Sequence, residues 1–232
     1  NSNFRIMKPE DAYNASWDSP LSEYSAGFNG TNPVYGVNPA NGLVLYYELP
    51  GNIPSEELTL EILNEEGKLI RKFSSKKDPN YKKHNGGGPP PAPVLSRDEG
   101  LNRFVWDMRY PNALAIPGKP KPNVRPFCKP GKYLVKLSDN GEEQTNEFEV
   151  FINPNEKYSK ADAEARFALW IKISDKYSEV SEAIIEAQEI AKNTDNDEVK
   201  KAAKDLEASM TAVGTTLVQI ANERSKLLAK IQ

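Results

Sequence analysis

The sequence predicts a β-sandwich of the immunoglobulin or fibronectin III type, followed by a long antiparallel hairpin of two helices. Two observations indicate this fold class: the composition changes near residue 155, and the spacing of apolar residues changes at the same point. All but one of the 18 prolines precede Ile152, and no proline follows Pro154. Because proline and glycine mark turns and interrupt helices, the first part is typical of short strands and the second of helices.

Three segments follow from this division. Residues 1–35 are expected to form an extended N-terminal segment that packs on the sandwich. Residues 36–153 are expected to form the sandwich, and residues 154–232 the helical hairpin. A chain of 232 residues is long enough for one large domain or two small ones.

The strands are predicted from alternating apolar side chains and from β-branched and aromatic residues. Asn64–Gly67 and Asp139–Gly141 are turn sequences between such segments. About six short strands in roughly 110 residues favour a two-layer sandwich. The predicted strands are Leu43–Leu49, Leu58–Leu63, Leu69–Phe73, Arg103–Met108, Tyr133–Leu137 and Thr145–Ile152.

Two long loops interrupt the predicted sandwich, at residues 76–99 and 111–130. The first is rich in lysine, glycine and proline, and the second is rich in proline. Loops of this length are usually functional or mobile. A tolerated surface insertion is the alternative, because loop-closure entropy grows only slowly with length.

The helical part begins at Ser159, which forms an approximate capping pair with Asp162. A second helix is expected to begin near Asn196 or Asp197, and each helix to run ~30 to 35 residues, or about 50 Å. The first helix carries an apolar stripe of Leu169, Ile173, Tyr177, Val180, Ile184, Ala187 and Ala191. The second carries Val199, Ala203, Leu206, Met210, Val213, Leu217, Ile220, Leu227 and Ile231, interrupted only by Arg224.

Two helices alone do not enclose a core. Their shared apolar stripe must be completed by the sandwich, by a third helix, or by the same hairpin of a second copy. A homodimer through the helices is therefore one expected assembly. The candidate interface residues are Leu206, Met210, Val213, Leu217, Ile220 and Leu227.

Composition excludes several classes of function. The net charge of -3 comes from 30 basic and 33 acidic residues, so the field that would attract nucleic acid is missing. Apolar runs fall well short of the ~20 residues that cross a bilayer. With one histidine and one cysteine, no metal site or cofactor is predicted. The chain starts at Asn1 without a signal-peptide pattern, so we expect a mature or trimmed piece.

Candidate catalytic residues lie in and beside the two loops. Cys128 would need a base and a lowered pKa to act as a nucleophile. A glycoside hydrolase would need two carboxylates, and it remains an alternative only if the loops gather Asp98, Glu99, Asp107 and His84 into one cleft. The structural alternative is that Asp107 accepts backbone hydrogen bonds in a turn and that His84 is a solvated loop residue. A basic cluster of Lys76, Lys77, Lys82 and Lys83 is read as a solvated loop rather than a phosphate site.

The stretch from Tyr13 to Tyr35 combines aromatic side chains with Asn, Ser and Gly. A sugar-binding face uses such residues, because pyranose CH groups stack on rings while amides take the hydroxyls. A carbohydrate-binding module is therefore an alternative function, set against ordinary packing of this segment over the sandwich. The candidate ligand-binding residues are Trp17, Tyr24, Phe28 and Tyr35.

Three segments together carry a resemblance to a known family: Gly36–Leu43 leading into Tyr46 and Tyr47, then Gly100–Pro111, then Pro130–Leu137. In that order they resemble the C-terminal region of bacterial exported proteins with sortilin-like (VPS10/BNR-type) propeller repeats, often labelled glycosyl hydrolases. The central part is also similar to the immunoglobulin-like domain of flagellar hook-capping proteins.

The resemblance implies an exported protein in which this region follows a propeller. The repeated Asp-box segments that mark the propeller are missing from this chain. Any active site of the family is expected in the propeller, so no catalytic residue is carried over. Trp106 is expected to anchor the core, Asp107 to fix the next turn, Gly131 to permit tight entry into a strand, and Tyr133 to fill the opposite face.

The expected function is a non-catalytic accessory and interaction region. It would position its own N-terminal propeller domain or bind another protein. A carbohydrate-binding module is the first alternative and a glycoside hydrolase the second.

Overall fold

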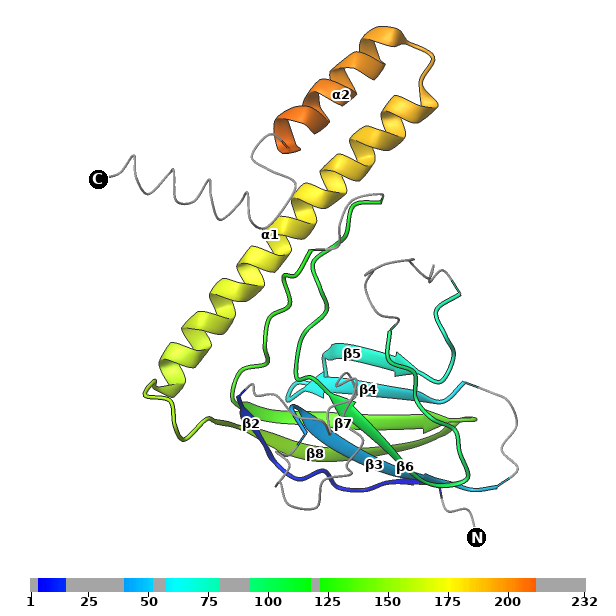
Figure 1. Cartoon of the computed structure of the whole chain (residues 1–232), viewed down its shortest axis with the longest axis vertical. Coiled ribbons are helices and arrows are strands. Elements are labelled where there is room, and N and C mark those ends of the chain that lie inside the picture. The colour runs from blue at the N-terminus through cyan, green and yellow to red at the C-terminus, as the bar shows by residue number, and fades with distance from the viewer. Residues whose placement is uncertain (1–3, 16–39, 52–56, 80–91, 118–121, 212–232) are drawn as a thin grey trace, which may run out of the picture. The chain divides into compact units, whose positions relative to one another are not determined.

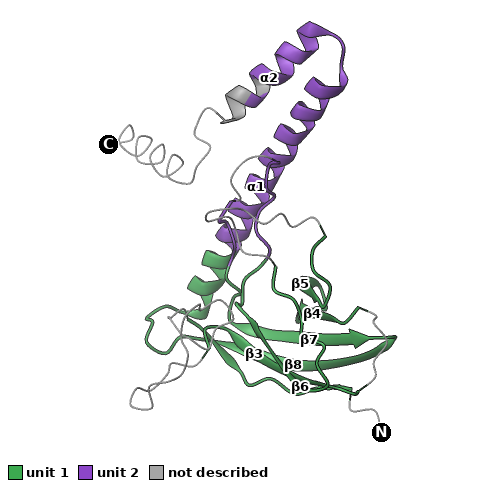
Figure 2. Ribbon diagram, turned by 45° about the vertical axis from the view of Figure 1, so that its right-hand side comes forward, with its two compact units in different colours: residues 1–110, 127–167 green, residues 111–126, 168–232 purple. Residues whose placement is uncertain are grey.

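A computed structural model describes residues 4–15, 40–51, 57–79, 92–117 and 122–211 (Figure 1). For Leu206 and residues 208–211 it describes the backbone alone. The chain divides into two compact units, coloured separately in Figure 2. The sandwich unit is Asn1–Tyr110 with Phe127–Phe167, and the helical unit is Pro111–Pro126 with Ala168–Gln232.

The described strands of the sandwich unit form two sheets. The three-stranded sheet has the order β1-β3-β6, and the five-stranded sheet has the order β2-β8-β7-β4-β5. Neighbouring strands are antiparallel, except that β2 runs parallel to β8. The strands are β1 Arg5–Ile6, β2 Ala12–Asn14, β3 Leu43–Leu49, β4 Thr59–Asn64, β5 Leu69–Ser74, β6 Gly100–Trp106, β7 Gly131–Asp139 and β8 Glu142–Ile152.

The predicted sandwich-like architecture is confirmed, and all six predicted strands form. Strand β6 differs in its limits, because it begins at Gly100 and ends at Trp106 rather than running from Arg103 to Met108. The backbone of Met108 has a φ of 53°, which no extended strand adopts. The strand therefore ends before that residue.

Strands β1 and β2 were not predicted as strands. Ile6 pairs with Tyr47 in the small sheet, and Ala12 pairs with Val150 in the large one. The described residues 4–15 thus add one strand to each sheet. Strands of two and three residues are too short to show an alternating pattern in the sequence.

An aromatic cluster lies in the core of the sandwich unit. Trp106 is 1% exposed, and its ring centroid lies 6.3 Å from that of Phe148 and 6.5 Å from that of Tyr133. The indole nitrogen Nε1 donates a hydrogen bond to the Arg109 carbonyl at 3.3 Å. Because the three rings come from both sheets, Trp106 is the core anchor that the sequence predicts.

Tight turns connect the antiparallel strands of the large sheet. Asn140 and Gly141 have φ values of 47° and 82°, the backbone of a two-residue type I′ hairpin between β7 and β8. Between β4 and β5, the Gly67 amide donates to the Asn64 carbonyl at 2.9 Å. Both turns lie where the sequence predicts them.

Two helices follow the sheets: α1 (Lys160–Asn193) and α2 (Asp197–Thr211). At the start of α1, the Ser159 hydroxyl and amide donate to Asp162 Oδ2 at 2.7 and 2.9 Å. These bonds lower the pKa of Asp162. At the start of α2, Asn196 Oδ1 accepts the Glu198 amide at 2.9 Å. Both predicted helix starts are confirmed.

Helix α1 passes from one unit into the other between Phe167 and Ala168. In the helical unit, it lies beside the proline-rich segment 111–126, whose Leu114 amide donates to Ser178 Oγ at 3.1 Å (Figure 2). The described residues of this segment therefore belong to the helical unit, although the sequence predicts them as a loop of the sandwich. Neither described helix is long and apolar enough to cross a membrane.

Candidate binding groove

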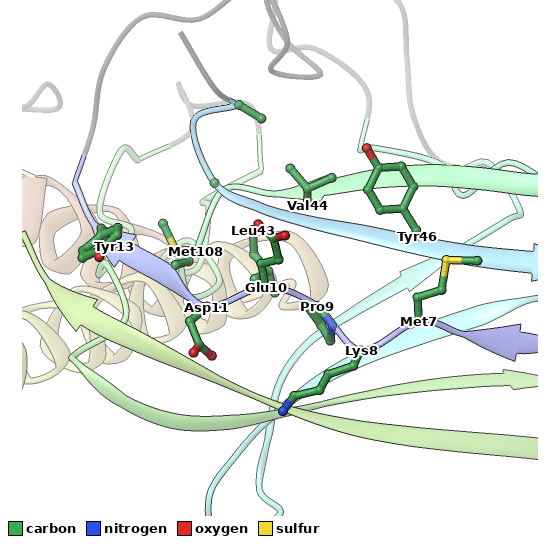
Figure 3. Close-up of a pocket in the computed structure, with 13 residues that line it drawn as sticks. Met7, Lys8, Pro9, Glu10, Asp11, Tyr13, Leu43, Val44, Tyr46 and Met108 are labelled. Atoms are coloured by element: carbon green, nitrogen blue, oxygen red, sulfur yellow. The ribbon is translucent and has the colours of Figure 1, made fainter.

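A groove of about 500 Å³ lies in the sandwich unit, between the N-terminal connection 7–13 and the first half of β3 (Figure 3). The connection crosses from the small sheet to the large one. The Met7 amide donates to the Tyr46 carbonyl at 2.9 Å, and Asp11 Oδ1 accepts the Glu149 amide at 2.8 Å. The wall of the groove is therefore held at both ends by hydrogen bonds to a sheet.

The groove combines an apolar lining with polar groups and two exposed rings. Leu43 and Met108 are buried in its floor, at 2% and 1% exposure. Tyr13 and Tyr46 are 48% and 40% exposed and lie towards opposite ends of the groove (Figure 3). Apolar surface with a few polar groups is the usual composition of a binding site. The arrangement suits ring stacking and hydrogen bonding.

Sequence reasoning found only part of this groove. Tyr13 begins the aromatic stretch that was predicted to bind ligand. Tyr46 belongs to β3, and the pattern of that strand shows only that every second side chain faces outward. The tyrosines are 33 residues apart in the sequence, so only the path of the N-terminal connection reveals that they line one groove.

Several predicted residues lie outside the described part of the chain. They include the candidate ligand-binding residues Trp17, Tyr24, Phe28 and Tyr35, and the loop residues His84, Lys82 and Lys83. They also include the interface candidates Val213, Leu217, Ile220 and Leu227. Leu206 and Met210 lie in α2, but their side chains are outside the description.

The acidic residues considered for hydrolysis lie at opposite ends of β6. Asp98 and Glu99 precede the strand, and Asp107 follows it. Seven residues at ~3.3 Å per residue separate the two ends by about 20 Å, whereas paired glycosidase carboxylates lie about 5 to 10 Å apart. The structure does not bring these three carboxylates into one cleft.

Each of the two aspartates takes part in local hydrogen bonds. Asp98 Oδ2 accepts the Ser96 hydroxyl at 2.7 Å, and the Asp98 carbonyl accepts Asn102 Nδ2 at 2.8 Å. Asp107 Oδ1 accepts the Arg109 amide at 3.2 Å. The turn role predicted for Asp107 is confirmed.

Cys128 is a core residue with 0% exposure. Its amide donates to the Met108 carbonyl at 2.8 Å, and its carbonyl accepts Asn14 Nδ2 at 2.8 Å. Burial raises the pKa of the Cys128 thiol far above its ordinary value. At neutral pH the group is a protonated thiol, which is a poor nucleophile. Within the described ranges, no three His, Cys, Asp or Glu side chains form a group that could hold a metal ion.

Comparisons with known proteins do not assign a family. No protein-family model matches the chain, and no curated protein matches it. A search of solved structures found CopC from Methylosinus trichosporium OB3b at 15% identity, covering 68% of this chain and 100% of that chain. The TM-score of 0.27 is too low to establish a shared fold or function.

Proposed function

We propose that this chain is a non-catalytic accessory and interaction region of an exported propeller-repeat protein. The observation that carries the proposal is that residues of the motifs that carry the resemblance have structural roles. Trp106 fills the core, and Asp107 caps the turn that follows it. Residues in these positions stabilise the fold. Contacts with a partner are therefore made by other residues, on the surface.

We assign the sandwich to the immunoglobulin or fibronectin III type. In that fold, the first, second and fifth main strands share one sheet, and the third, sixth and seventh strands share the other. The β1-β3-β6 sheet and the β8-β7-β4-β5 order support this assignment. A second support is Tyr133 near the start of β7, whose hydroxyl donates to the Lys129 carbonyl at 2.6 Å. Immunoglobulin-like domains use such a tyrosine corner at the equivalent strand.

The proposed partner is the protein's own N-terminal propeller domain. Association in trans tests this: the separately expressed propeller should bind the chain in titration calorimetry. Tyr46→Ala should weaken the binding if the groove makes the contact, whereas Leu69→Ala, at an exposed site on β5, should leave it unchanged. A failure to bind at any accessible concentration contradicts the partner assignment. Turnover of a glycoside by the purified chain contradicts the non-catalytic assignment.

Carbohydrate binding is the second candidate, and the groove is the observation that favours it. Its exposed Tyr13 and Tyr46 offer two ring faces, and Lys8 and Glu10 beside them offer polar groups for hydroxyls. On a glycan array, the chain should retain a sugar, and Tyr13→Ala or Tyr46→Ala should abolish retention. Tyr158→Ala is the matched control, since Tyr158 does not line the groove. Retention that survives both groove substitutions rules out this site.

A further inference from the structure

The N-terminal strand β1 is hydrogen-bonded along both of its edges. On one side it pairs with β3, and the Met7 amide extends this pairing by donating to the Tyr46 carbonyl at 2.9 Å. Backbone groups alternate in direction along an antiparallel strand, so those of Phe4 and Ile6 point away from β3. The outer edge of a terminal strand is commonly left unpaired, but here it is bonded as well.

Two side-chain amides of β8 bond this second edge in place of a neighbouring strand. Gln144 Oε1 accepts the Ile6 amide at 3.1 Å, and Gln144 Nε2 donates to the Phe4 carbonyl at 2.8 Å. Asn146 Nδ2 donates to the Ile6 carbonyl at 2.8 Å. We call the surface formed by the β3 edge, Gln144 and Asn146 the strand seam. It binds the backbone of an extended segment from both sides.

The strand seam also selects side chains. Phe4 and Ile6 are buried in the hydrophobic core, at 6% and 5% exposure. Arg5 lies between them on the outside, where its Nε bonds Glu48 Oε2 at 2.7 Å. The seam therefore fits an extended segment in which two apolar residues flank a basic one, and Phe4-Arg5-Ile6 is such a segment.

The ladder pairing of the segment 4–15 with the sheets is short. Strand β1 has two residues and β2 has three, and their release would leave the longer β3–β6 and β7–β8 pairs intact. An element with so few ladder pairs opens more readily than the whole sandwich. Residues 16–39 separate it from Ala40 in the sequence, and at up to about 3.5 Å per residue this stretch is long enough to reach an adjacent molecule.

We infer that the strand seam is an interaction surface for the N-terminal segment of a second copy, so that two chains exchange residues 4–15. The second copy is the occupant because its segment makes every hydrogen bond and apolar contact that the structure shows. Exchange re-forms in the dimer the contacts that each monomer loses, so the chain concentration sets the balance. This surface differs from the helical interface predicted from the sequence, and the inference does not depend on the proposed function.

A disulfide between chains tests the exchange directly. Arg5 and Glu48 are partners in the β1–β3 register, so cysteines at these positions are within disulfide reach. When a chain with Arg5→Cys is mixed with a chain with Glu48→Cys, mild oxidation should link the two chains one to one. Replacing the second chain by Leu69→Cys, at an exposed site on β5, is the matched control and should give several-fold less product. The buried Cys128 should stay unreacted in all three chains.

Sedimentation velocity measures the dimer without a cross-link. The dimer fraction of the unsubstituted chain should rise with concentration. Ile6→Asp should abolish the dimer, because a carboxylate does not enter the apolar site that Ile6 fills. Gln144→Ala combined with Asn146→Ala should weaken it several-fold. Leu101→Asp introduces the same charge at a site 63% exposed on β6 and should leave the dimer unchanged.

Two results would overturn the inference. One is a chain that stays monomeric at every accessible concentration. The other is a dimer that gives no Arg5–Glu48 cross-link above the Leu69 control, because the two copies would then meet through another surface. If Ile6→Asp unfolds the sandwich, the cysteine pair still decides, since the Arg5 side chain is 61% exposed and Glu48 bonds it on the outside.

Discussion

Trp106 is the largest fully buried side chain among the described residues. Its indole is 1% exposed, contacts the rings of Tyr133 and Phe148, and has its nitrogen hydrogen-bonded. Trp106→Ala should lower the free energy of unfolding by about 3 to 5 kcal/mol, from lost burial and a remaining cavity. Urea denaturation followed by circular dichroism measures this loss. Leu101→Ala, at a site 63% exposed on the same strand, should cost far less, and equal losses would contradict the assigned role.

The Cys128 thiol should be chemically silent in the folded protein. Burial raises its pKa, so the reactive thiolate is absent at pH 8, and the side chain has no access to reagent. A thiol reagent such as dithionitrobenzoate should label it only as fast as the sandwich opens. Added urea should accelerate labelling in step with unfolding. Rapid stoichiometric labelling without denaturant would show that the residue is not in the core.

At the residue scale, the sequence predicts roles set by local chemistry. The turn function of Asp107 follows from its position after a strand, and the cap at Ser159 follows from the spacing to Asp162. The sequence did not predict that Asp98 and Asp107 lie too far apart to act as a pair of catalytic carboxylates. Their separation depends on how far β6 extends between them, and the predicted strand began three residues too late.

At the scale of strands, the close packing of β3 against β6 depends on Gly42. This residue has a φ of 143°, and an added Cβ would lie 2.3 Å from the Trp106 carbonyl oxygen. Gly42→Ala should therefore destabilise the protein by more than about 1 kcal/mol, since both the backbone angle and the space exclude a side chain. Gly67→Ala separates the two causes, because Gly67 has a φ of 78° with nothing near its Cβ position. Thermal unfolding that ranks Gly67→Ala as the more damaging change would contradict the steric argument.

A row of charges crosses the outer face of the large sheet. Glu61 on β4 bonds to Lys136 on β7 at 3.0 Å and to Lys72 on β5 at 3.3 Å. The hydrogen bond from Lys136 is the main cause that lowers the pKa of Glu61. A lowered folded-state pKa means that this carboxylate stabilises the protein at neutral pH and that the stabilisation is lost as pH falls through that pKa.

Glu61→Gln should therefore reduce stability at pH 7 and change it little at pH 3. Chemical denaturation at a series of pH values measures the difference. Glu143→Gln removes a carboxylate that is 57% exposed on the neighbouring strand and should have a smaller effect. A Glu61→Gln effect that is equal at both pH values would show that the ion pairs contribute nothing.

The strands and helices that the sequence predicts best are those with long periodic patterns. Strand β3 forms over the predicted range Leu43–Leu49, and α1 follows its predicted cap. Strands β1 and β2 could not be predicted, because their positions depend on partners more than 40 and 130 residues away. Pairing over such distances leaves no local pattern.

At the scale of the whole molecule, protection from hydrogen exchange should follow the sheet order. Strand β7 lies between β8 and β4 and carries buried side chains such as Val135 and Leu137, so its amides should exchange most slowly. The two short N-terminal strands β1 and β2 should exchange much faster. Exchange followed by mass spectrometry tests this ranking, and equal protection of β1 and β7 would contradict it.

The candidate groove belongs to this scale as well. Its walls come from a connection between two sheets and from the outer face of a strand, and neither has a signature of its own in the sequence. The aromatic stretch that starts at Tyr13 indicated a binding function. The place of Tyr13 in the groove could not be predicted, because it depends on how the N-terminal connection runs between the two sheets.

The path of the chain around the proline-rich segment has a consequence for modularity. Segment 111–126 leaves the sandwich after Tyr110 and returns at Phe127, and a bridge between Arg109 and Phe127 already joins the two margins. The two ends of the segment are thus joined within the sandwich unit. Next to that bridge, the Cys128 amide donates a hydrogen bond to the Met108 carbonyl. A substitute of a few residues could span the same gap, so this position can accept inserts of different length and chemistry without disturbing the pairing of Arg109 with Phe127.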